Sequence, residues 1–571
     1  MAAEPTVPIA QPSGALWLVG MMGAGKSTVG RMLGEATGRT FVDLDWRIEE
    51  TSGRSIAEIF EKDGEAAFRA LEAEHVLRIA DESAGTIGPV VAAGGGAPTH
   101  SGNLELMRGS GLVVWLRADV DEVLRRLDVR SRPLLARAAD ARARLLQLES
   151  QRRDYYRQAD LTIDRGERES RAVADEILKW LVDHGGTSLA LPPLGSGGRE
   201  LSVELPSARY HVLVDTHLDA AQHFAARLAR IAPPGRTRVG LVTDENVERL
   251  HGTRYLAALQ KRGFRVMSAI VPAGEESKSL GRVEEVCEAL ALGGLDRRSL
   301  VVALGGGVVG DLAGFVAAIL FRGIAWAHVP TTLLAQVDAS VGGKTGVNLV
   351  PGKNLVGAFH QPSLVLADVG SLATLDARDL RSGLGEIVKH AFLEGGALLE
   401  RIEARADDAR AGDRTLLAEL IASSVELKAR IVAADERESL PDGGRALLNL
   451  GHTIGHALET ASARDPETHG LEGTPLRHGE AVALGLLAAA RLGKELLDEH
   501  PDLEPRLVTL LGRLGLPVDL DERLKRPLAL AAITLDKKRA GGQLRLVLLE
   551  KPGAAKVIAV DTARVRTLLV R

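Results

Sequence analysis

The stretch that most constrains the fold lies near the N-terminus, where residues 20–27 read GMMGAGKS. It follows an apolar run at residues 16–19, which the pattern predicts as a buried strand, and it precedes an amphipathic helix predicted from Ser27 to about Thr37. A strand, a G-x-x-x-x-G-K-S loop and a helix, in this order, are typical of a loop whose backbone N–H groups surround phosphate oxygens. The start of the chain is therefore expected to be an α/β domain with a parallel sheet.

A chain of 571 residues is too long for one domain, and its composition shows where it divides. Residues 184–200, HGGTSLALPPLGSGGRE, contain five glycines and two adjacent prolines and are predicted as a linker. Apolar runs alternate with helical stretches on both sides of it, which is typical of parallel sheets covered by helices. Beyond about residue 375 the pattern is Ala/Leu-rich and helical. We expect domains at 12–183, 201–370 and 371–571, the last of them all-helical.

The composition excludes several classes of protein. Lys plus Arg is 71 and Asp plus Glu is 76, so the net charge of −5 gives no reason to expect a nucleic-acid partner. Cys287 is the single cysteine, so a metal site has to be built from histidines and carboxylates. No N-terminal signal pattern and no apolar run of roughly 18 residues is found, so we expect a cytoplasmic protein without a membrane partner.

The phosphate-loop motif predicts roles for residues within it and after it. Lys26 is expected to neutralise the β- and γ-phosphates, and Ser27 to ligate Mg²⁺. Asp43 and Asp45 flank Leu44 at the end of a predicted strand, so both carboxylates are expected on one face. One of them would serve Mg²⁺ and its waters, and the other an acceptor hydroxyl.

Further motifs follow in a fixed order: GRSI at 53–56, GE at 64–65 with FR at 68–69, GGGA at 94–97, RPLL at 132–135, and Arg152 before Tyr156. With the phosphate loop, they resemble shikimate kinase over residues 12–183. The resemblance implies Mg²⁺ and ATP, with Asp45 and the lid residue Arg132 as catalytic groups beside Lys26, and Asp43 reaching Mg²⁺ through water. It implies ATP contacts from Gly23, Gly25, Lys26, Ser27, Thr28 and Arg132, and shikimate contacts from Asp45, Arg69, Gly94, Gly95, Gly96 and Arg152. Arg153 adjoins Arg152, so which of the two contacts shikimate stays open.

The second half carries a different glycine loop and a candidate metal site. GGGVVGD at 305–311 follows a predicted strand and is weak evidence for a pyrophosphate site, since it is not G-x-G-x-x-G. Glu386, His452, His456 and His478 lie in predicted helices. Two histidines and one carboxylate with an open fourth position would form a catalytic zinc site, and His452 and His456, four residues apart, need not both be ligands.

With VPTTLLAQVD at 329–338, GGKT at 342–345, PGKN at 351–354 and DKK at 536–538, these segments resemble 3-dehydroquinate synthase from about residue 203 to 571. The resemblance implies Zn²⁺ or Co²⁺ on Glu386, His452 and His478, with His456 near the substrate phosphate. It implies catalytic roles for Asp338, Lys344, Lys389 and His456. NAD⁺ contacts would be Asp244, Asn246, Glu275, Lys278, Gly306, Gly307, Asp311, Thr331, Thr332, Lys344 and Lys353. Substrate contacts would be Asp338, Lys344, Asn354, Lys389, Lys428, Arg445, Asn449, His456 and Lys538, and Arg322 from a neighbouring subunit, which implies a homodimer.

Together these resemblances imply a bifunctional shikimate-pathway enzyme. A P-loop kinase domain with a parallel sheet would be joined to an α/β NAD-binding domain and an all-helical metal-binding domain. The expected reactions are ATP-dependent phosphorylation of shikimate, and cyclisation of 3-deoxy-D-arabino-heptulosonate 7-phosphate to 3-dehydroquinate with release of phosphate. The alternative is another small-molecule P-loop kinase fused to another sugar-phosphate cyclase or to a metal-dependent polyol dehydrogenase.

Overall fold

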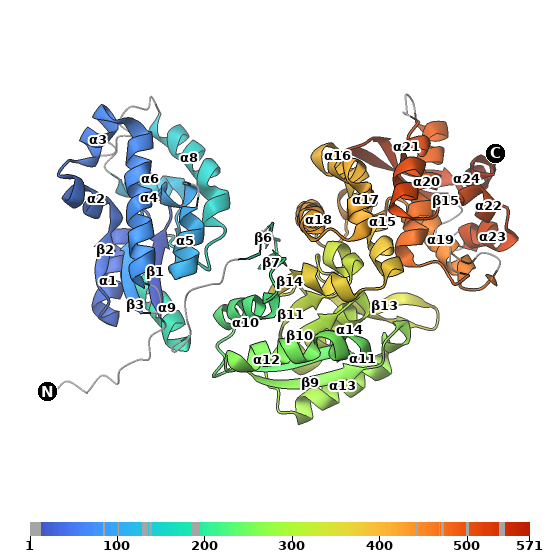
Figure 1. Cartoon of the computed structure of the whole chain (residues 1–571), viewed down its shortest axis with the longest axis horizontal. Coiled ribbons are helices and arrows are strands. Elements are labelled where there is room, and N and C mark those ends of the chain that lie inside the picture. Colours follow the sequence, from blue (N-terminus) through green and yellow to red (C-terminus); the bar gives the residue numbers. More distant parts are fainter. Residues whose placement is uncertain are drawn as a thin grey trace. The chain divides into compact units, whose positions relative to one another are not determined.

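A computed structural model describes residues 13–83, 86–100, 102–127, 135, 140–184, 194–195, 197–440, 443–466, 469, 473–497, 502–535 and 543–570. Two residues assigned above, Arg132 and Lys538, lie outside these ranges. The contacts divide the chain into two compact units. In Figure 1 the strands of the first are blue to cyan and those of the second are green to red. Unit 1 is Met1–Pro193 with His223–Arg236, and unit 2 is Leu194–Gln222 with Thr237–Arg571.

Unit 1 is built on a five-stranded parallel sheet in the order β2-β3-β1-β4-β5. Alternate residues of β1 enter two different cores: Trp17 packs towards α4, α5 and α8, and Leu18 towards α1 and α9. This confirms the predicted α/β fold with helices on both faces. The strands are β1 (Gly14–Val19), β2 (Phe41–Asp43), β3 (Ile87–Ala92), β4 (Gly111–Arg117) and β5 (Leu161–Asp164). The helices are α1 (Lys26–Thr37), α2 (Leu44–Ser52), α3 (Ile56–Lys62), α4 (Gly64–Ser83), η1 (Ala97–Thr99), α5 (Asn103–Ser110), α6 (Val120–Arg126), α8 (Ala141–Tyr156) and α9 (Ser170–Asp183).

The first lobe of unit 2 is a seven-stranded sheet in the order β6-β7-β14-β11-β10-β8-β9. Every pair is parallel except β6 with β7. The strands are β6 (Arg199–Glu204), β7 (Arg209–Asp215), β8 (Arg238–Asp244), β9 (Arg265–Val271), β10 (Leu300–Gly305), β11 (Ala325–Pro330) and β14 (Leu364–Asp368), with a hairpin of β12 (Lys344–Leu349) and β13 (Gly352–Phe359). The helices are α11 (Glu245–Val247), η3 (Glu248–Gly252), α12 (Thr253–Lys261), η4 (Glu275–Ser277), α13 (Leu280–Leu292), α14 (Gly307–Ile319), η5 (Leu320–Arg322) and η6 (Ala335–Ala339). Helix α10 (Ala220–Ile231) follows β7 in the chain, and most of its residues belong to unit 1.

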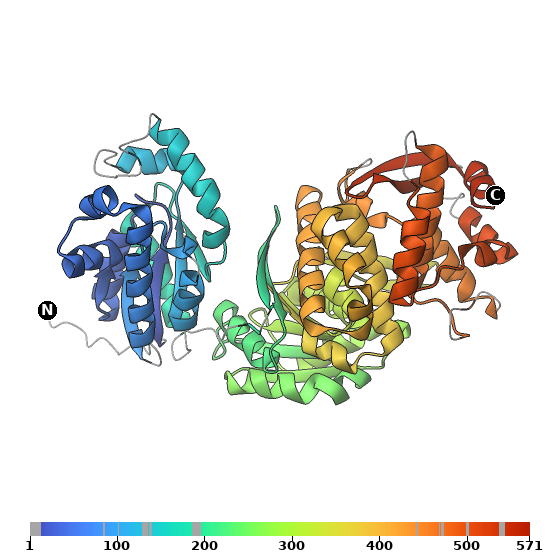
Figure 2. The same ribbon diagram turned by 45° about the horizontal axis from the view of Figure 1, so that its top comes forward.

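Helices from α15 onwards gather in a second lobe of unit 2 (Figures 1 and 2). They are η7 (Val369–Thr374), α15 (Ala377–Glu394), α16 (Gly396–Ala404), α17 (Ala406–Ala411), α18 (Arg414–Ala434), η8 (Gly444–Asn449), α19 (His452–Ser462), α20 (His478–Leu496), α21 (Glu504–Leu514), α22 (Leu520–Leu524), α23 (Pro527–Leu535) and α24 (Thr562–Leu569). The lobe is helical as predicted, with one addition: β15 (Gln543–Lys551) and β16 (Ala554–Asp561) form an antiparallel hairpin. No helix in the described part of the chain is long and apolar enough to cross a membrane.

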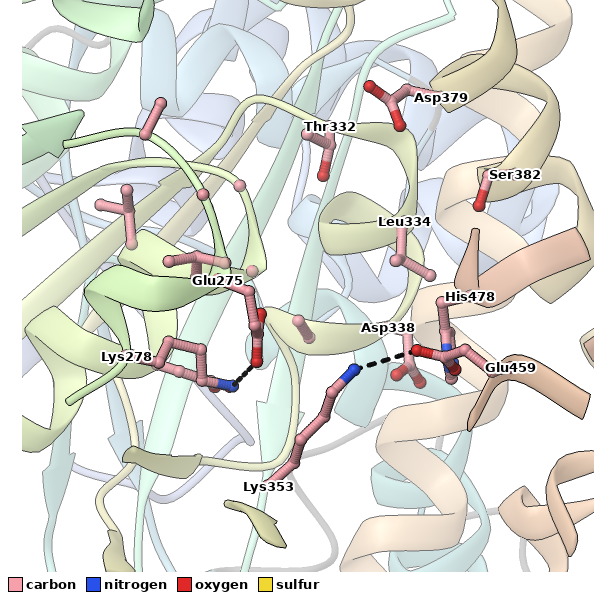
Figure 3. A pocket seen from close by; sticks show the side chains of 18 of the residues that line it. Glu275, Lys278, Thr332, Leu334, Asp338, Lys353, Asp379, Ser382, Glu459 and His478 are labelled. Atoms are coloured by element: carbon pink, nitrogen blue, oxygen red, sulfur yellow. Dashed lines mark hydrogen bonds and ion pairs between the residues drawn. The ribbon is translucent and has the colours of Figure 1, made fainter. Parts of the chain in front are cut away.

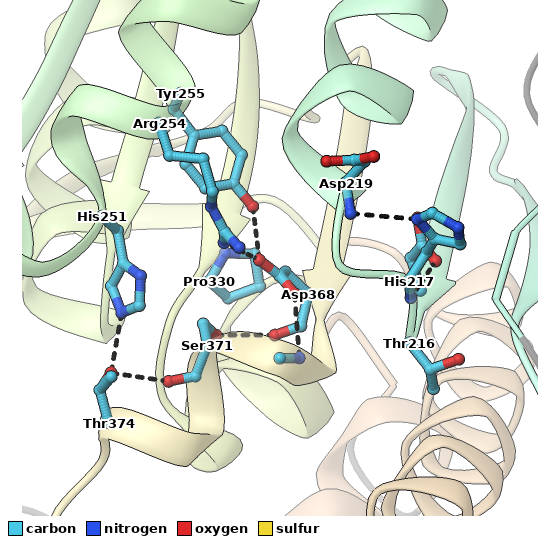
Figure 4. A network of polar contacts seen from close by, with 12 residues as sticks. Thr216, His217, Asp219, His251, Arg254, Tyr255, Pro330, Asp368, Ser371 and Thr374 are labelled. Carbon is cyan, nitrogen blue, oxygen red and sulfur yellow. Dashed lines mark hydrogen bonds and ion pairs between the residues drawn. The ribbon is translucent and has the colours of Figure 1, made fainter.

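A buried polar network joins the two lobes of unit 2 (Figure 4). Asp368, fully buried at the end of β14, accepts hydrogen bonds from the Tyr255 hydroxyl at 2.9 Å and from the Gly370 N–H at 2.9 Å. Arg254 pairs with the same carboxylate, and His251 lies 2.8 Å from the Thr374 hydroxyl. Because Asp368 is the last residue of the sheet before η7 and α15, the network fixes where the helical lobe begins.

Candidate active sites

The phosphate loop of unit 1 turns sharply between β1 and α1. Gly20, Gly23 and Gly25 have φ of 138°, 79° and 88°, conformations that residues with a Cβ rarely adopt. The Lys26 ammonium donates to the carbonyls of Gly20 at 2.9 Å and Met21 at 3.0 Å, so it lies folded over the loop. The geometry is that of a phosphate cradle with its cation in place.

Two oxygen ligands suited to Mg²⁺ meet beside this cradle. The Ser27 hydroxyl donates to Asp43 Oδ2 at 2.6 Å. Asp43 ends β2 and its side chain caps α2, so Asp45 lies in the first turn of a helix and not at the end of the strand as the sequence suggested. The reason is local: the Asp43 carboxylate accepts the Asp45 N–H and starts the helix there.

Each glycine of the triple-glycine loop leaves room for a different charged side chain. A Cβ on Gly94 would lie 2.2 Å from Glu72 Oε1 and 3.2 Å from Asp45 Oδ1. One on Gly95 would lie 3.1 Å from Arg152 Nη1, and one on Gly96 would lie 2.4 Å from the Arg69 guanidinium. The loop therefore gathers two cations and two carboxylates, as a site for a small hydroxy acid requires.

The structure favours Arg152 over Arg153 for this site. Arg152 is 5% exposed and faces the glycine loop, whereas the Arg153 side chain is 46% exposed and pairs with Glu149. The Tyr156 hydroxyl donates to the Gly95 carbonyl at 2.5 Å, and burial raises its pKa to about 12. Arg152 and Tyr156, one turn apart on α8, thus hold the loop together.

Glu72 is a site residue that the sequence reasoning missed. It is fully buried on α4, and Arg69 Nη1 donates to its Oε2 at 2.6 Å, while Oε1 has no hydrogen-bond partner among the described residues. Burial raises its pKa even though Arg69 opposes the shift. The available signal was its position three residues after Arg69, which places both on one helix face.

Unit 2 contains a cavity of 1470 Å³ at the carboxyl ends of its parallel strands, where β8, β10 and β11 end. Figure 3 shows charged side chains reaching it from both lobes. Among the residues assigned from sequence it is lined by Asp244, Asn246, Glu275, Lys278, Gly306, Gly307, Asp311, Thr331, Thr332, Asp338, Lys353, Asn354, His456 and His478. His251, Thr374, Asp379, Ser382 and Glu459 also line it, and the sequence reasoning did not find them.

Other assigned residues lie behind the cavity wall or beyond it. Lys428 is buried, and its Nζ donates to Asp338 Oδ1 at 2.7 Å. Arg445 is buried and donates to the Gly342 carbonyl at 3.0 Å, and Lys344 pairs with Glu438. Asn449 Nδ2 lies 3.5 Å from Glu438 Oε1, so Glu438, which the sequence reasoning missed, joins Lys344 to Asn449.

Three helices bring the predicted metal ligands together. Glu386 is buried on α15, and His452 and His478 are the first residues of α19 and α20. Glu386 Oε1 lies 3.5 Å from His452 Nε2 and 3.3 Å from His478 Nε2. Donor atoms bound tetrahedrally to a zinc-sized ion lie roughly 3.3 Å apart, so the distances from Glu386 to each histidine match the spacing of ligands around such an ion.

His456 lies near the same three groups but stands apart from the carboxylate. Its ring centroid is 5.1 Å from that of His452 and 5.5 Å from that of His478, and the three histidines could share an ion. Within the described residues, however, the histidines that come within 4 Å of Glu386 are His452 and His478. This favours the ligand set expected from sequence.

Close helix packing places these ligands. A Cβ on Gly479 would lie 1.7 Å from the Ser382 carbonyl oxygen, and one on Gly385 would lie 2.4 Å from the Gly479 oxygen, so α15 and α20 cross with their backbones touching. Arg378 on α15 holds Glu480 on α20 through two hydrogen bonds of 2.7 Å, and both side chains are buried. His478 is thus a proposed metal ligand, Gly479 makes the close backbone contact, and Glu480 holds α20 to α15 through Arg378.

Glu459 on α19 contacts the proposed metal ligand His478 on the ring nitrogen that faces away from Glu386. Its Oε2 lies 3.2 Å from His478 Nδ1, and its Oε1 accepts from Lys353 Nζ at 3.0 Å (Figure 3). The hydrogen bond keeps the proton of His478 on Nδ1, so Nε2 can face Glu386 as a ligand. Lys353 comes from the β12–β13 hairpin of the other lobe, so the carboxylate also ties the two lobes together.

Electrostatics at this centre depend on charge pairing. Burial opposes ionisation of Glu386, but Lys389 and His478 hold its pKa well below the usual range. Burial, with help from Lys389, lowers the pKa of His452 to about 3, which leaves a neutral imidazole. A second cluster, Asp338, Glu386 and His390, is a poorer cation site because Lys428 already pairs with Asp338.

Comparisons with known proteins agree with this division. A shikimate kinase family model matches residues 22–182, and models of the 3-dehydroquinate synthase N-terminal and C-terminal domains match 268–382 and 383–539. A 3-dehydroquinate synthase from Symbiobacterium thermophilum is 46% identical over 62% of the chain and 95% of its own length. One from Cereibacter sphaeroides is 45% identical over 64% of the chain and 96% of its own length.

Solved structures of other cyclases are more distant. A 2-deoxy-scyllo-inosose synthase complexed with carbaglucose-6-phosphate, NAD⁺ and Co²⁺ is 26% identical, with a TM-score of 0.55 over 65% of this chain and 99% of its own. A 2-epi-5-epi-valiolone synthase from Streptomyces hygroscopicus with NAD⁺ and Zn²⁺ is 28% identical, with a TM-score of 0.53 over 64% of this chain and 97% of its own. The chain is 46% identical to the 3-dehydroquinate synthase but only 28% identical to the 2-epi-5-epi-valiolone synthase, which disfavours the alternative of another cyclase.

Proposed function

Since the chain belongs to the 3-dehydroquinate synthase family and carries a shikimate kinase domain, it is a bifunctional enzyme of the shikimate pathway, and we propose how its residues serve each reaction. The observation that carries the kinase half is the triple-glycine loop, which packs Asp45, Arg69 and Arg152 together. The observation that carries the synthase half is the convergence of Glu386, His452 and His478 beside the cavity.

In the kinase half, the loop N–H groups and Lys26 hold the phosphates of ATP, and Ser27 and Asp43 hold Mg²⁺. Mg²⁺ supplies charge neutralisation on the transferring phosphoryl group. Arg69 and Arg152 bind the shikimate carboxylate, and Asp45 orients the acceptor hydroxyl. Arg132 is proposed to close over the phosphates as the resemblance implies.

In the synthase half, Asp244, Gly306, Gly307 and their neighbours at the strand ends hold NAD⁺, and Glu386, His452 and His478 hold Zn²⁺ or Co²⁺. When bound, NAD⁺ would supply reversible hydride transfer and the metal ion would supply polarisation of the substrate hydroxyl. The cations that line and back the cavity (Lys353, Lys389, Lys428, Arg445) hold the two anionic groups of the substrate apart. Asp338 and Lys428, 2.7 Å apart, form an ion pair that touches the cavity through Asp338.

We also propose that the protein is a homodimer and that it is located in the cytoplasm. A homodimer through the synthase half is supported by Arg322, whose backbone has φ of 71° beside Phe321 at 52°, a strained conformation of the kind that is kept at functional sites. A cytoplasmic location is supported by the single cysteine and is tested by cell fractionation.

The experiment uses the full chain and two variants. Lys26→Ala should abolish shikimate-dependent ADP formation and leave phosphate release from the heptulosonate phosphate unchanged. Glu386→Gln should abolish phosphate release from the heptulosonate phosphate and leave shikimate-dependent ADP formation unchanged. Because the synthase returns its hydride, no net NADH should accumulate. NADH accumulation would support the polyol dehydrogenase instead, and loss of both activities in either variant would contradict two separate sites.

A further inference from the structure

Arg165, the residue after β5, is a buried cation whose charge is not balanced by a neighbour. It is 7% exposed, and its Nε and Nη1 atoms are buried without a hydrogen-bond partner. Nη2 donates to the Ser170 hydroxyl at 3.1 Å. No carboxylate among the described residues lies within 4 Å of the guanidinium, although burying an unpaired charge is costly.

The guanidinium lies against the phosphate loop. A Cβ on Gly25 would lie 3.3 Å from Arg165 Nε and 3.8 Å from Nη2. Gly25 is the N-cap of α1 and immediately precedes Lys26 and Ser27, the residues proposed to hold phosphate and Mg²⁺. Since β1 and β5 both run parallel to β4, the end of β5 reaches the same edge of the sheet as the phosphate loop.

The charged groups facing Arg165 increase the need for an anion. Arg126 and Arg168 carry the same charge, and they add to burial in lowering its pKa. The opposite charge is Glu122, whose Oε2 is buried without a hydrogen-bond partner. Glu122 is therefore the rival partner that an experiment has to exclude.

We propose that Arg165 belongs to the nucleotide site and binds a phosphate oxygen of the nucleoside triphosphate beside Gly25. This inference rests on the kinase function proposed above. Lys26 and the loop N–H groups hold the phosphates from one side, and Arg165 supplies a second cation next to the loop. In the empty protein Arg165 destabilises the fold, and the bound nucleotide removes that cost.

The test measures binding of Mg-ADP and of adenosine to the full chain by calorimetry, with NAD⁺ at saturation to occupy the cavity of unit 2. Arg165→Met should weaken ADP binding by about 10- to 100-fold, the loss expected for one charge-assisted hydrogen bond. Adenosine binding should be unchanged, since it has no phosphate. Arg165→Lys should recover part of the ADP affinity.

Thermal unfolding without nucleotide separates this role from a structural one. Arg165→Met should leave the midpoint of unit 1 unchanged or raise it, because an unbalanced cation is removed. The control Arg171→Met, at a side chain that is 70% exposed and paired with Asp175, should change neither ADP affinity nor midpoint.

Two outcomes would overturn the proposal. One is wild-type ADP affinity in Arg165→Met. The other is a lower midpoint in Arg165→Met that Glu122→Gln reproduces, as a pair between Arg165 and Glu122 requires. If the unchanged protein binds no ADP at all, the kinase assignment itself fails, which is a different result.

Discussion

At the scale of single residues, the contacts of Glu459 predict an effect on metal binding. Glu459→Gln loses the charge that holds His478 Nδ1 and Lys353. Removing such a partner of a metal ligand typically weakens the metal by 10- to 100-fold, so a loss of about that size is expected. Competition with a chelator, using the full chain and Zn²⁺, measures it. Glu495→Gln, an exposed acid on α20, is the matched control, and equal affinity in the two variants would contradict the role.

His328 on β11 predicts how stability depends on pH. Complete burial lowers its pKa from 6.5 to about 4, and the Gly305 backbone opposes this shift only in part. Below pH 6.5 the unfolded chain takes up a proton that the folded chain refuses, so folding becomes less favourable as pH falls towards 4. The full cost is about 3 kcal/mol. Denaturant unfolding of unit 2 in His328→Gln should show a shallower loss between pH 6.5 and 4. An unchanged slope would mean that His328 does not titrate in this range.

At the scale of elements, the crossing of α15 and α20 predicts that Gly479 cannot be replaced. A methyl group there would meet the Ser382 carbonyl oxygen at 1.7 Å. Backbone cannot move aside as a flexible side chain does, so Gly479→Ala should destabilise unit 2 by about 3 kcal/mol or more and release the metal. Gly512→Ala, in α21 with no atom within 4 Å of its Cβ position, should instead stabilise by about 0.5–1 kcal/mol. Denaturant titration with metal analysis compares them, and equal effects would exclude the crossing as the cause.

Local signals predicted most elements but not their pairings. The apolar run at residues 16–19 predicted β1, and the alternation of apolar runs with helical stretches predicted the parallel sheets, because buried parallel strands are continuous apolar stretches. The strand before Asp45 was predicted to end too late because the Asp43 side chain caps α2, a signal that hydrophobic periodicity does not carry. Glu72 and Glu459 were missed because their importance comes from partners brought close by tertiary packing, Asp45 and Gly94 for one and Lys353 for the other. The β15–β16 hairpin was missed because its strands lie within a mainly helical lobe.

At the scale of the whole molecule, the proposed homodimer predicts complementation between inactive subunits. If Arg322 serves the neighbouring subunit, Arg322→Ala and Glu386→Gln inactivate different residues of one composite site. Mixing the two variants and allowing exchange should restore synthase activity, because mixed dimers contain one site with both residues intact. Synthase assays before and after exchange measure it. Activity that never exceeds the sum of the separate variants would show that Arg322 acts within its own chain or not at all.

The three proposed metal ligands are spread along residues 386–478, and this spacing sets when the centre can form as the chain is made. The sheet of unit 2 and α15 are complete before His478 exists, so Glu386 has to wait for about 90 further residues. At roughly 5–20 residues per second this takes on the order of 5–20 s. During that interval a carboxylate destined for burial stays without the histidines that compensate it. The ion therefore joins the helical lobe as one of the last steps of biosynthesis, and cells short of metal would accumulate chains whose N-terminal kinase has already folded.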